Sequence, residues 1–181
     1  DSPWEEEIHL SCDNRLTLTD VKVRNQVEEG LAAIVHKHFP TAEVLMGTST
    51  AGIAHAAITA TLLNLPMGYV RGSSKDHGRG NQIEGKLERG QKVVVIEDLI
   101  STAGSSIEVV NVLREAGADV LGIASIFTYG MTKGINNLKV ANVVNYSLSN
   151  LDTLVEVAVE EGYIQADDKA RLLAFRNNPN D

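Results

Sequence analysis

The stretch VVVIEDLISTAGS, residues 93–105, decides the fold of this chain. An apolar run rich in β-branched residues and flanked by polar ones is typical of a central strand in a parallel sheet, where both faces are buried. Glu97 and Asp98 come directly after that run. We therefore expect them at the carboxyl end of the strand, the edge at which open α/β sheets bind ligands. A turn rich in hydroxyl groups and glycine then leads into a helix.

The polar parts of this stretch predict contacts with a phosphorylated sugar. Two neighbouring carboxylates offer paired acceptors for a sugar cis-diol. The turn offers backbone N–H groups and hydroxyls at a helix N-terminus, which suit a phosphate dianion. It contains no lysine, which argues against a GxxxxGK[ST] nucleotide loop. A plain N-cap would explain Ser105, but it would not explain two adjacent acids that repel each other.

The rest of the chain alternates strands and helices around this centre. Apolar spacing and capping residues predict helices over 20–38, 52–63, 104–116, 151–161 and 166–175, and strands over 44–47, 67–71, 92–96, 120–127 and 140–146. This order predicts an α/β fold with a mostly parallel sheet flanked by helices on both faces. Right-handed crossovers would then bring the loops after the first three strands to one edge of the sheet.

Four further stretches narrow the assignment: CDNRLTL at 12–18, GTSTAGIAHAA at 47–57, KDHGRGNQIEG at 75–85 and IFTY at 126–129. Together with residues 93–105 they resemble the orotate phosphoribosyltransferases, a branch of the type I phosphoribosyltransferases. The resemblance implies the type I phosphoribosyltransferase fold as a single domain over 1–181. It also implies a small N-terminal hood over 1–19, which would bind the base, and a mobile catalytic lid over 72–83.

That family transfers a phosphoribosyl group from PRPP to orotate, which yields orotidine 5′-monophosphate and pyrophosphate in the biosynthesis of UMP. The resemblance implies the same reaction here, with Mg²⁺ as the cofactor. The sequence offers no dedicated cluster of metal ligands, so we expect substrate oxygens and water to carry the ion. The resemblance also implies a homodimer in which the lid of one subunit closes over the site of the other.

The family's motifs also imply roles for individual residues. Lys75, His77 and Asp98 would be catalytic, and Ser101 would also contact orotate. The pyrophosphate loop would consist of Thr48, Ser49, Thr50 and Ala51. The residues expected to bind PRPP are Arg71, Lys75, His77, Glu97, Asp98, Leu99, Ile100, Ser101, Thr102, Ala103, Gly104 and Ser105.

The sequence departs from the family's pattern at several places. Gly72 stands where several members carry a second basic residue, and Tyr129 has no neighbouring arginine to hold an orotate carboxylate. Ala103 stands where glycine is common, and we expect its methyl group to be tolerated on an ordinary backbone. Residues 5–7 are glutamates, which would repel an anionic base. The alternatives are therefore a phosphoribosyltransferase for another nucleobase, a non-catalytic PRPP-sensing regulator and an unrelated phosphate-binding domain.

Composition limits the partners and the setting. The chain has 181 residues, enough for one well-filled core and too few for two ordinary domains. With 24 acidic and 16 basic residues its formal charge is −8, which disfavours binding to nucleic acid. No apolar run has the length of a membrane helix, so no membrane partner is expected. Cys12 is the single cysteine, which excludes an intrachain disulfide and favours a cytoplasmic location.

Overall fold

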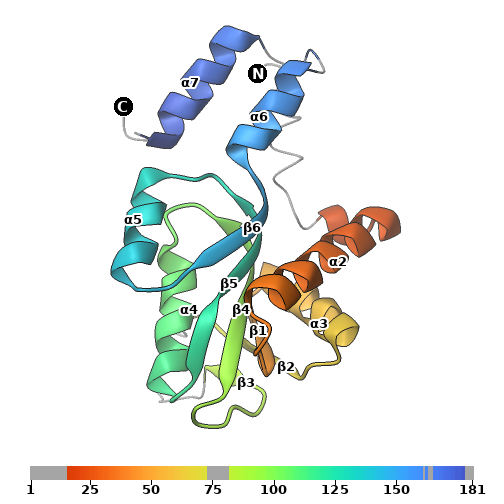
Figure 1. The fold of residues 1–181 in the computed structure, drawn as a ribbon, viewed down its shortest axis with the longest axis vertical. Helices are drawn as coiled ribbons and strands as arrows, with labels where there is room; N and C mark the ends of the chain where they lie inside the picture. Colours follow the sequence, from red (N-terminus) through yellow and green to blue (C-terminus); the bar gives the residue numbers. More distant parts are fainter. Residues whose placement is uncertain (1–15, 73–81, 161, 163–164, 178–181) are drawn as a thin grey trace.

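The computed structural model describes residues 16–72, 82–160, 162 and 165–177. A six-stranded sheet lies between two layers of helices (Figure 1). The strands are β1 (Val44–Thr48), β2 (Met67–Val70), β3 (Ile83–Glu84), β4 (Lys92–Ile100), β5 (Asp119–Thr128) and β6 (Asn145–Asn150). The helices are η1 (Leu16–Leu18), α2 (Val21–His38), α3 (Ala51–Leu63), α4 (Gly104–Glu115), α5 (Thr132–Val140), α6 (Leu151–Glu160) and α7 (Ala166–Asn177).

The order of the strands creates a crevice in the middle of the sheet. The order is β3-β2-β1-β4-β5-β6, and every neighbouring pair is parallel except β2 with β3. After β1 the chain moves outward to β2, whereas β4 returns to the other side of β1. The loops that leave the carboxyl ends of β1 and β4 therefore diverge. This is a topological switch point, the position at which open α/β sheets bind their ligands.

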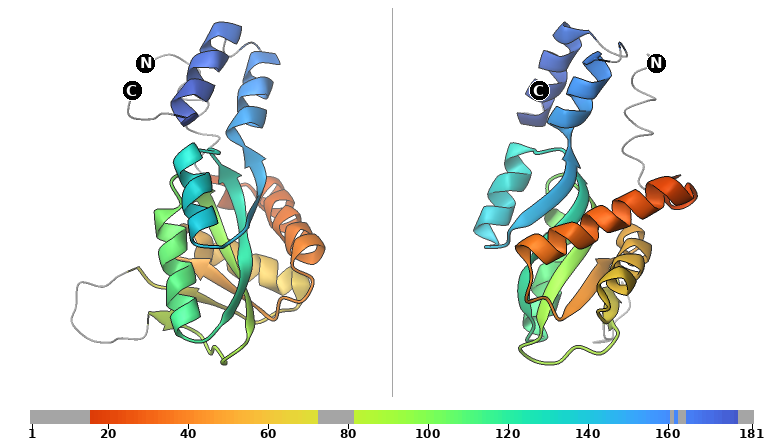
Figure 2. Two further views of the ribbon diagram at one scale, coloured as in Figure 1. Left: turned by 60° about the vertical axis from the view of Figure 1, so that its left-hand side comes forward. Right: turned by 45° about the vertical axis from the view of Figure 1, so that its right-hand side comes forward.

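Alternating side chains of the central strand fill both halves of the core. Val93 and Val95 share a buried cluster with Leu113 of α4. Val94 and Ile96 belong to the opposite cluster, which includes residues of α2 and α3. All four are fully buried. Figure 2 shows α2 and α3 on one side of the sheet with α4 and α5 on the other, which confirms the expected fold class.

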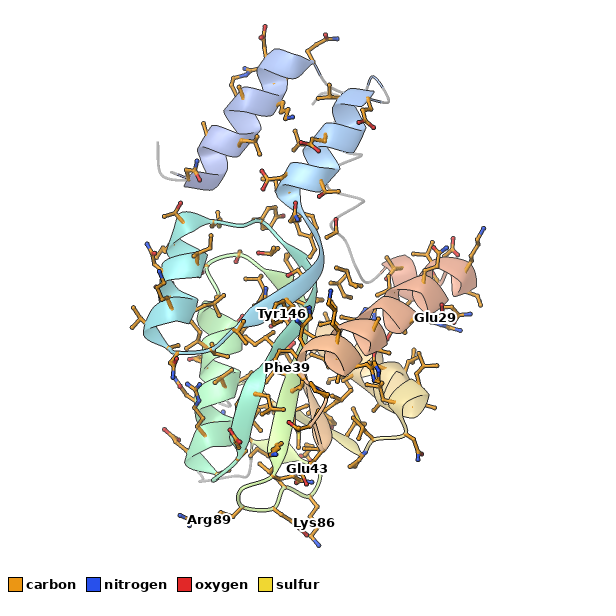
Figure 3. All side chains as sticks on the ribbon, in the orientation of Figure 1. Glu29, Phe39, Glu43, Lys86, Arg89 and Tyr146 are labelled. Atoms are coloured by element: carbon orange, nitrogen blue, oxygen red, sulfur yellow. The ribbon has the colours of Figure 1, made fainter. Side chains whose placement is uncertain are left out.

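Aromatic rings join the end of α2 to the edge strand β6. Phe39, which follows α2, meets Tyr146 edge to face with ring centroids 5.7 Å apart (Figure 3). The ring of His38 stacks on the same Tyr146 ring with centroids 3.7 Å apart. The Cβ of a residue at position 122 would lie 2.6 Å from the Phe39 ring, so Gly122 leaves the space that the ring occupies.

Two expectations about elements differ from the structure. The central strand was expected to end at residue 96, but β4 continues to Ile100 because β5 remains its hydrogen-bonded partner as far as Thr128. A strand over 140–146 is wrong. Val140 ends helix α5 with 89% of its surface exposed, and Asn142 turns the chain with a φ of 53° before β6 begins at Asn145.

The predicted hood and lid are described only in part. Of the hood, residues 16–19 carry the short helix η1, and the remaining positions lie outside the described residues. Of the lid, the described ends are Gly72 and residues 82–83, with Ile83 in β3. α6 and α7 lie together beyond the end of β6 (Figure 1). In the described part of the chain, no helix combines the length and apolar character needed to cross a membrane.

Candidate active site

The loops after β1, β2 and β4 surround one cavity of about 640 Å³. Its lining includes most of the residues that the sequence singled out. Of the expected site residues in the described part of the chain, Ile100, Thr102, Ala103 and Gly104 are not among the lining residues. Those that line it are Thr48, Ser49, Thr50, Ala51, Arg71, Glu97, Asp98, Leu99, Ser101 and Ser105.

The first loop runs from the end of β1 into helix α3. Ser49 is tied to the neighbouring strand, since both its backbone N–H (3.3 Å) and its hydroxyl (2.7 Å) donate to the carbonyl of Val70. Thr50 precedes α3 and makes no side-chain capping hydrogen bond. The Ile53 N–H donates to the Thr50 carbonyl at 3.2 Å, whereas the two N–H groups before it in the first helical turn have no intrahelical acceptor, and the helix dipole favours an anion at this end. The loop can therefore bind a phosphate group.

The second loop leads from β4 into helix α4. Ala103 occupies the N-cap position without a side-chain capping bond, so this helix also presents its first N–H groups. Its backbone has φ 68° and ψ 7°, in the left-handed region. We expected the Ala103 methyl group to be tolerated if the backbone had an ordinary conformation, and the backbone does not have one. Alanine is strained in this conformation, which explains why glycine suits the position better.

Replacing Ala103 by glycine should leave the free energy of unfolding unchanged to within about 0.5 kcal/mol. Relief of the left-handed backbone, worth roughly 1 kcal/mol, offsets the lost methyl burial and the added chain entropy. The matched control is Ala33→Gly on the exposed face of α2, which should cost about 1 kcal/mol. Urea denaturation of both variants tests this. Equal destabilisation by the two changes would contradict the strain argument.

Glu97 connects the two loops from the middle of the crevice. Its Oε1 accepts hydrogen bonds from the Thr48 hydroxyl at 2.8 Å and from the Asp98 N–H at 3.0 Å. Its Oε2 accepts one from the Ser106 hydroxyl at 2.7 Å. Glu97 is 5% exposed, whereas Asp98 is only half-buried. The two acids therefore differ in kind: Glu97 is held by protein donors, and Asp98 is the more accessible carboxylate.

The pKa of Glu97 is raised from 4.5 to about 7, and burial of the carboxyl group is the largest cause. A hydrogen bond with the Asp98 side chain and the negative charge of Asp98 also raise this pKa, while the hydroxyls of Ser106 and Thr48 lower it. Near neutral pH, Glu97 is thus close to half-protonated. Two adjacent carboxylates can share the site because they do not both carry a full charge.

This raised pKa predicts a pH dependence of stability. Between pH 4.5 and 7 the unfolded chain loses the Glu97 proton while the folded protein keeps it, so the stability present at low pH is lost as pH rises. The loss amounts to about 3 kcal/mol by pH 8. Glu97→Gln should lack it, since the amide stays neutral. Urea denaturation at pH 5 and pH 8 measures the difference. The exposed control Glu29→Gln should follow the wild-type profile, and a Glu97→Gln profile equal to wild type would refute the assignment.

Arg71 stands at the edge of the cavity, directly after β2. Its backbone N–H donates to Gln82 at 2.7 Å, and its Nε lies 3.2 Å from Oε1 of Glu84. Because 55% of the Arg71 side chain is exposed, this ion pair contributes little to stability and leaves a cation beside the cavity. Lys75 and His77, the other two expected cations, lie outside the described residues.

The sequence reading missed Ser106 as a site residue. Ser106 is 1% exposed and lies in the first turn of α4, one position beyond the expected phosphate turn. Its contact with Glu97 spans nine residues along the chain. The sequence gives only a weak signal that Ser106 belongs to the site. A serine near the start of a helix is usually explained as a helix cap.

The sequence profile of the phosphoribosyl transferase domain matches residues 17–158. The chain therefore belongs to the phosphoribosyltransferase family, the class of protein that the fold and the two-loop site define. Within that family it belongs with the orotate phosphoribosyltransferases. The orotate phosphoribosyltransferase of Bacillus cytotoxicus is 57% identical over 172 residues, which cover 95% of this chain and 82% of that protein.

Further relatives agree with this placement. The orotate phosphoribosyltransferase of Bacillus cereus is 57% identical over 94% of this chain and 81% of its own length. The crystal structure of orotate phosphoribosyltransferase from Aeropyrum pernix superimposes with a TM-score of 0.73 and 28% identity, over 83% of this chain and 82% of that one. The structure of Leishmania donovani UMP synthase, at 24% identity and a TM-score of 0.75, shows the same fold over 90% of this chain and 34% of its own.

Proposed function

We propose that this chain transfers the phosphoribosyl group of PRPP to orotate, forming orotidine 5′-monophosphate and pyrophosphate in pyrimidine biosynthesis. The observation that carries the proposal is the arrangement of two uncapped helix N-termini on either side of the Glu97–Asp98 pair. PRPP has a matching shape, with phosphate groups at both ends of a ribose diol. The 57% identity to proteins named orotate phosphoribosyltransferase supports orotate as the acceptor.

In this proposal the cavity and the turn at its edge bind different parts of PRPP. The turn of residues 101–105 and the start of α4 bind the 5-phosphate. Asp98 accepts hydrogen bonds from the ribose hydroxyls, and Glu97 orders Thr48 and Ser106 around it. Residues 48–51 and Arg71 bind the pyrophosphate, together with Lys75 and His77 by resemblance to the family.

The reaction breaks the bond between ribose C1 and a pyrophosphate oxygen and forms a bond between C1 and a ring nitrogen of orotate, which gives up its proton to water or to the departing pyrophosphate. The electron pair of the broken bond leaves with pyrophosphate, so negative charge grows on that group while the ribose becomes cationic. In this proposal the N–H groups of the first loop and Arg71 stabilise the leaving group. The Asp98 carboxylate stabilises the ribose cation.

The donor set suits magnesium that is held largely by substrate. In the described part of the chain, no group of three or more His, Cys, Asp or Glu side chains could hold a metal ion. The Glu97 oxygens already accept three hydrogen bonds, so Glu97 is poorly suited to bind the ion. Bound to phosphate oxygens and water, Mg²⁺ would neutralise charge on the pyrophosphate.

An assay of several bases tests the proposed acceptor. With PRPP and Mg²⁺ present, orotate absorbance should fall with stoichiometric release of pyrophosphate, and uracil, adenine and hypoxanthine should give no product. Product with one of those bases and none with orotate would indicate another phosphoribosyltransferase. PRPP binding by calorimetry without turnover of any base would favour the regulator. Failure to bind PRPP would reject the phosphoribosyl site itself.

We also propose a homodimer that shares the lid between subunits, in a cytoplasmic setting consistent with the single cysteine. Mixing Lys75→Ala chains with Asp98→Asn chains tests the shared lid, because only a mixed dimer can contain one site with both residues intact. Partial recovery of activity supports the shared site. Absence of recovery, with exchange of subunits shown by a tagged chain, argues for self-contained subunits.

A further inference from the structure

Helix α5 packs closely against the loop between β4 and α4. A Cβ at position 134 would lie 2.3 Å from the carbonyl oxygen of Ser101, so only glycine permits this approach. One turn further along α5, the Asn137 side-chain amide donates a 2.9 Å hydrogen bond to the carbonyl oxygen of Thr102. Two successive carbonyl groups of the loop therefore face α5.

The other end of α5 is attached to the end of α4. Arg114 in the last turn of α4 donates from Nη1 to the carbonyl of Ala141 at 2.6 Å and from Nη2 to that of Asn142 at 2.8 Å. Both carbonyls directly follow α5. Hydrogen bonds at both ends therefore hold α5 against α4 and the loop that precedes it.

Because the peptide bond is planar, a contact that fixes the direction of a carbonyl group also fixes the direction of the N–H group in the same peptide. In a trans peptide the carbonyl oxygen and the next N–H point in opposite directions. When the carbonyls of Ser101 and Thr102 face α5, the N–H groups of Thr102 and Ala103 point away from it. Successive N–H groups beside a left-handed residue form an anion-binding concavity, and Ala103 is such a residue.

We propose that Asn137 is a positioning residue for the 5-phosphate of PRPP: it holds the Thr102–Ala103 peptide so that the Ala103 N–H faces the phosphate. Asn137 itself does not touch the substrate. The inference rests on the proposed function and adds a residue from an element that the sequence reading did not recognise. The amide group suits this task because it donates to a carbonyl without adding a charge near the phosphate.

Separate binding of the two product fragments tests the inference without turnover. Calorimetry should show that Asn137→Asp, which keeps the shape but removes the donor, binds ribose 5-phosphate about tenfold more weakly and binds pyrophosphate as wild type does. Asn137→Gln, which retains a donor, should recover part of the loss. The control Asn136→Asp makes the same charge change at the exposed neighbouring position and should match wild type in both measurements.

Steady-state kinetics provide a second readout. Since the 5-phosphate does not change during the reaction, Asn137→Asp should raise KM for PRPP about tenfold while kcat stays within about twofold. Asn137→Ala and Gly134→Ala disturb the same carbonyls without adding a charge and should show the same selective loss of ribose 5-phosphate binding, so the test survives if the aspartate variant does not fold.

Equal weakening of ribose 5-phosphate and pyrophosphate binding, or identical behaviour of the Asn137 and Asn136 variants, would overturn the inference. In either case the proposed function would still hold if the wild-type protein binds ribose 5-phosphate. A wild-type protein that does not bind ribose 5-phosphate would overturn both. The identity of the acceptor base does not affect any of these outcomes.

Discussion

Asp98→Asn should lower kcat/KM for PRPP by at least about a hundredfold, the loss typical when one group that stabilises transition-state charge is removed. The asparagine side chain keeps the size of the aspartate but loses its charge. It can no longer stabilise a cationic ribose, and it accepts hydrogen bonds from the ribose hydroxyls less strongly. Initial rates at several PRPP concentrations, with orotate saturating, measure the loss.

A matched control separates this effect from general damage. Asp119 is exposed at the amino end of β5, the opposite edge of the sheet from the cavity. Asp119→Asn should retain wild-type kinetics. A wild-type kcat/KM for Asp98→Asn would remove Asp98 from the mechanism. The hydrogen bond and charge of Asp98 both raise the pKa of Glu97. The Asp98→Asn change should therefore also lower that pKa, which NMR titration of a labelled Glu97 carboxyl can follow without substrate.

Glu28→Leu should reduce the free energy of unfolding by about 3 to 5 kcal/mol, as expected when one partner of a buried polar pair is removed. Glu28 in α2 is fully buried and is paired with Nδ1 of His55 in α3. Its other oxygen accepts a 3.2 Å hydrogen bond from the Thr59 hydroxyl. Leucine fills a similar volume, so the cost comes chiefly from two buried donors that lose their acceptor.

Two further variants test that explanation by urea denaturation. Glu29→Leu, on the exposed side of the same helix, should change stability by less than about 0.5 kcal/mol. The double variant Glu28→Leu, His55→Leu should be more stable than Glu28→Leu alone, because it also removes one of the stranded polar groups. If the double variant were less stable by the sum of both single losses, the pair would not be coupled.

The sequence located the inner strands β1, β4 and β5 well because these strands are buried on both faces along most of their length. A strand in that position must be apolar at successive residues, and the run from Val93 to Ile96 satisfies this requirement without reference to any distant residue. The positions of the loops at the switch point were also predicted from the sequence, because hydroxyl and glycine residues directly follow the apolar strands. Their placement around one cavity followed from the handedness of the crossovers.

The short helix α5 escaped prediction for a physical reason. It has nine residues, and of these only Gly134 is classed as buried. Its three large apolar residues, Ile135, Leu138 and Val140, are too few to define a helical face. Val140 at its end and Val143 and Val144 after it look like a strand in sequence. In the structure they belong to a helix end and a turn, because Asn142 adopts a left-handed conformation.

The sequence by itself determined where the inner strands lie, which loops follow them with hydroxyl and glycine residues, and which family the chain resembles. These features depend on residues that are neighbours along the chain. Only the tertiary structure decided that Glu97 is held by Thr48 and Ser106, and that Asn137 holds the loop before α4. Such contacts join residues up to 49 positions apart. No local pattern encodes them, because they form only when packing of the helices on the sheet brings those residues together.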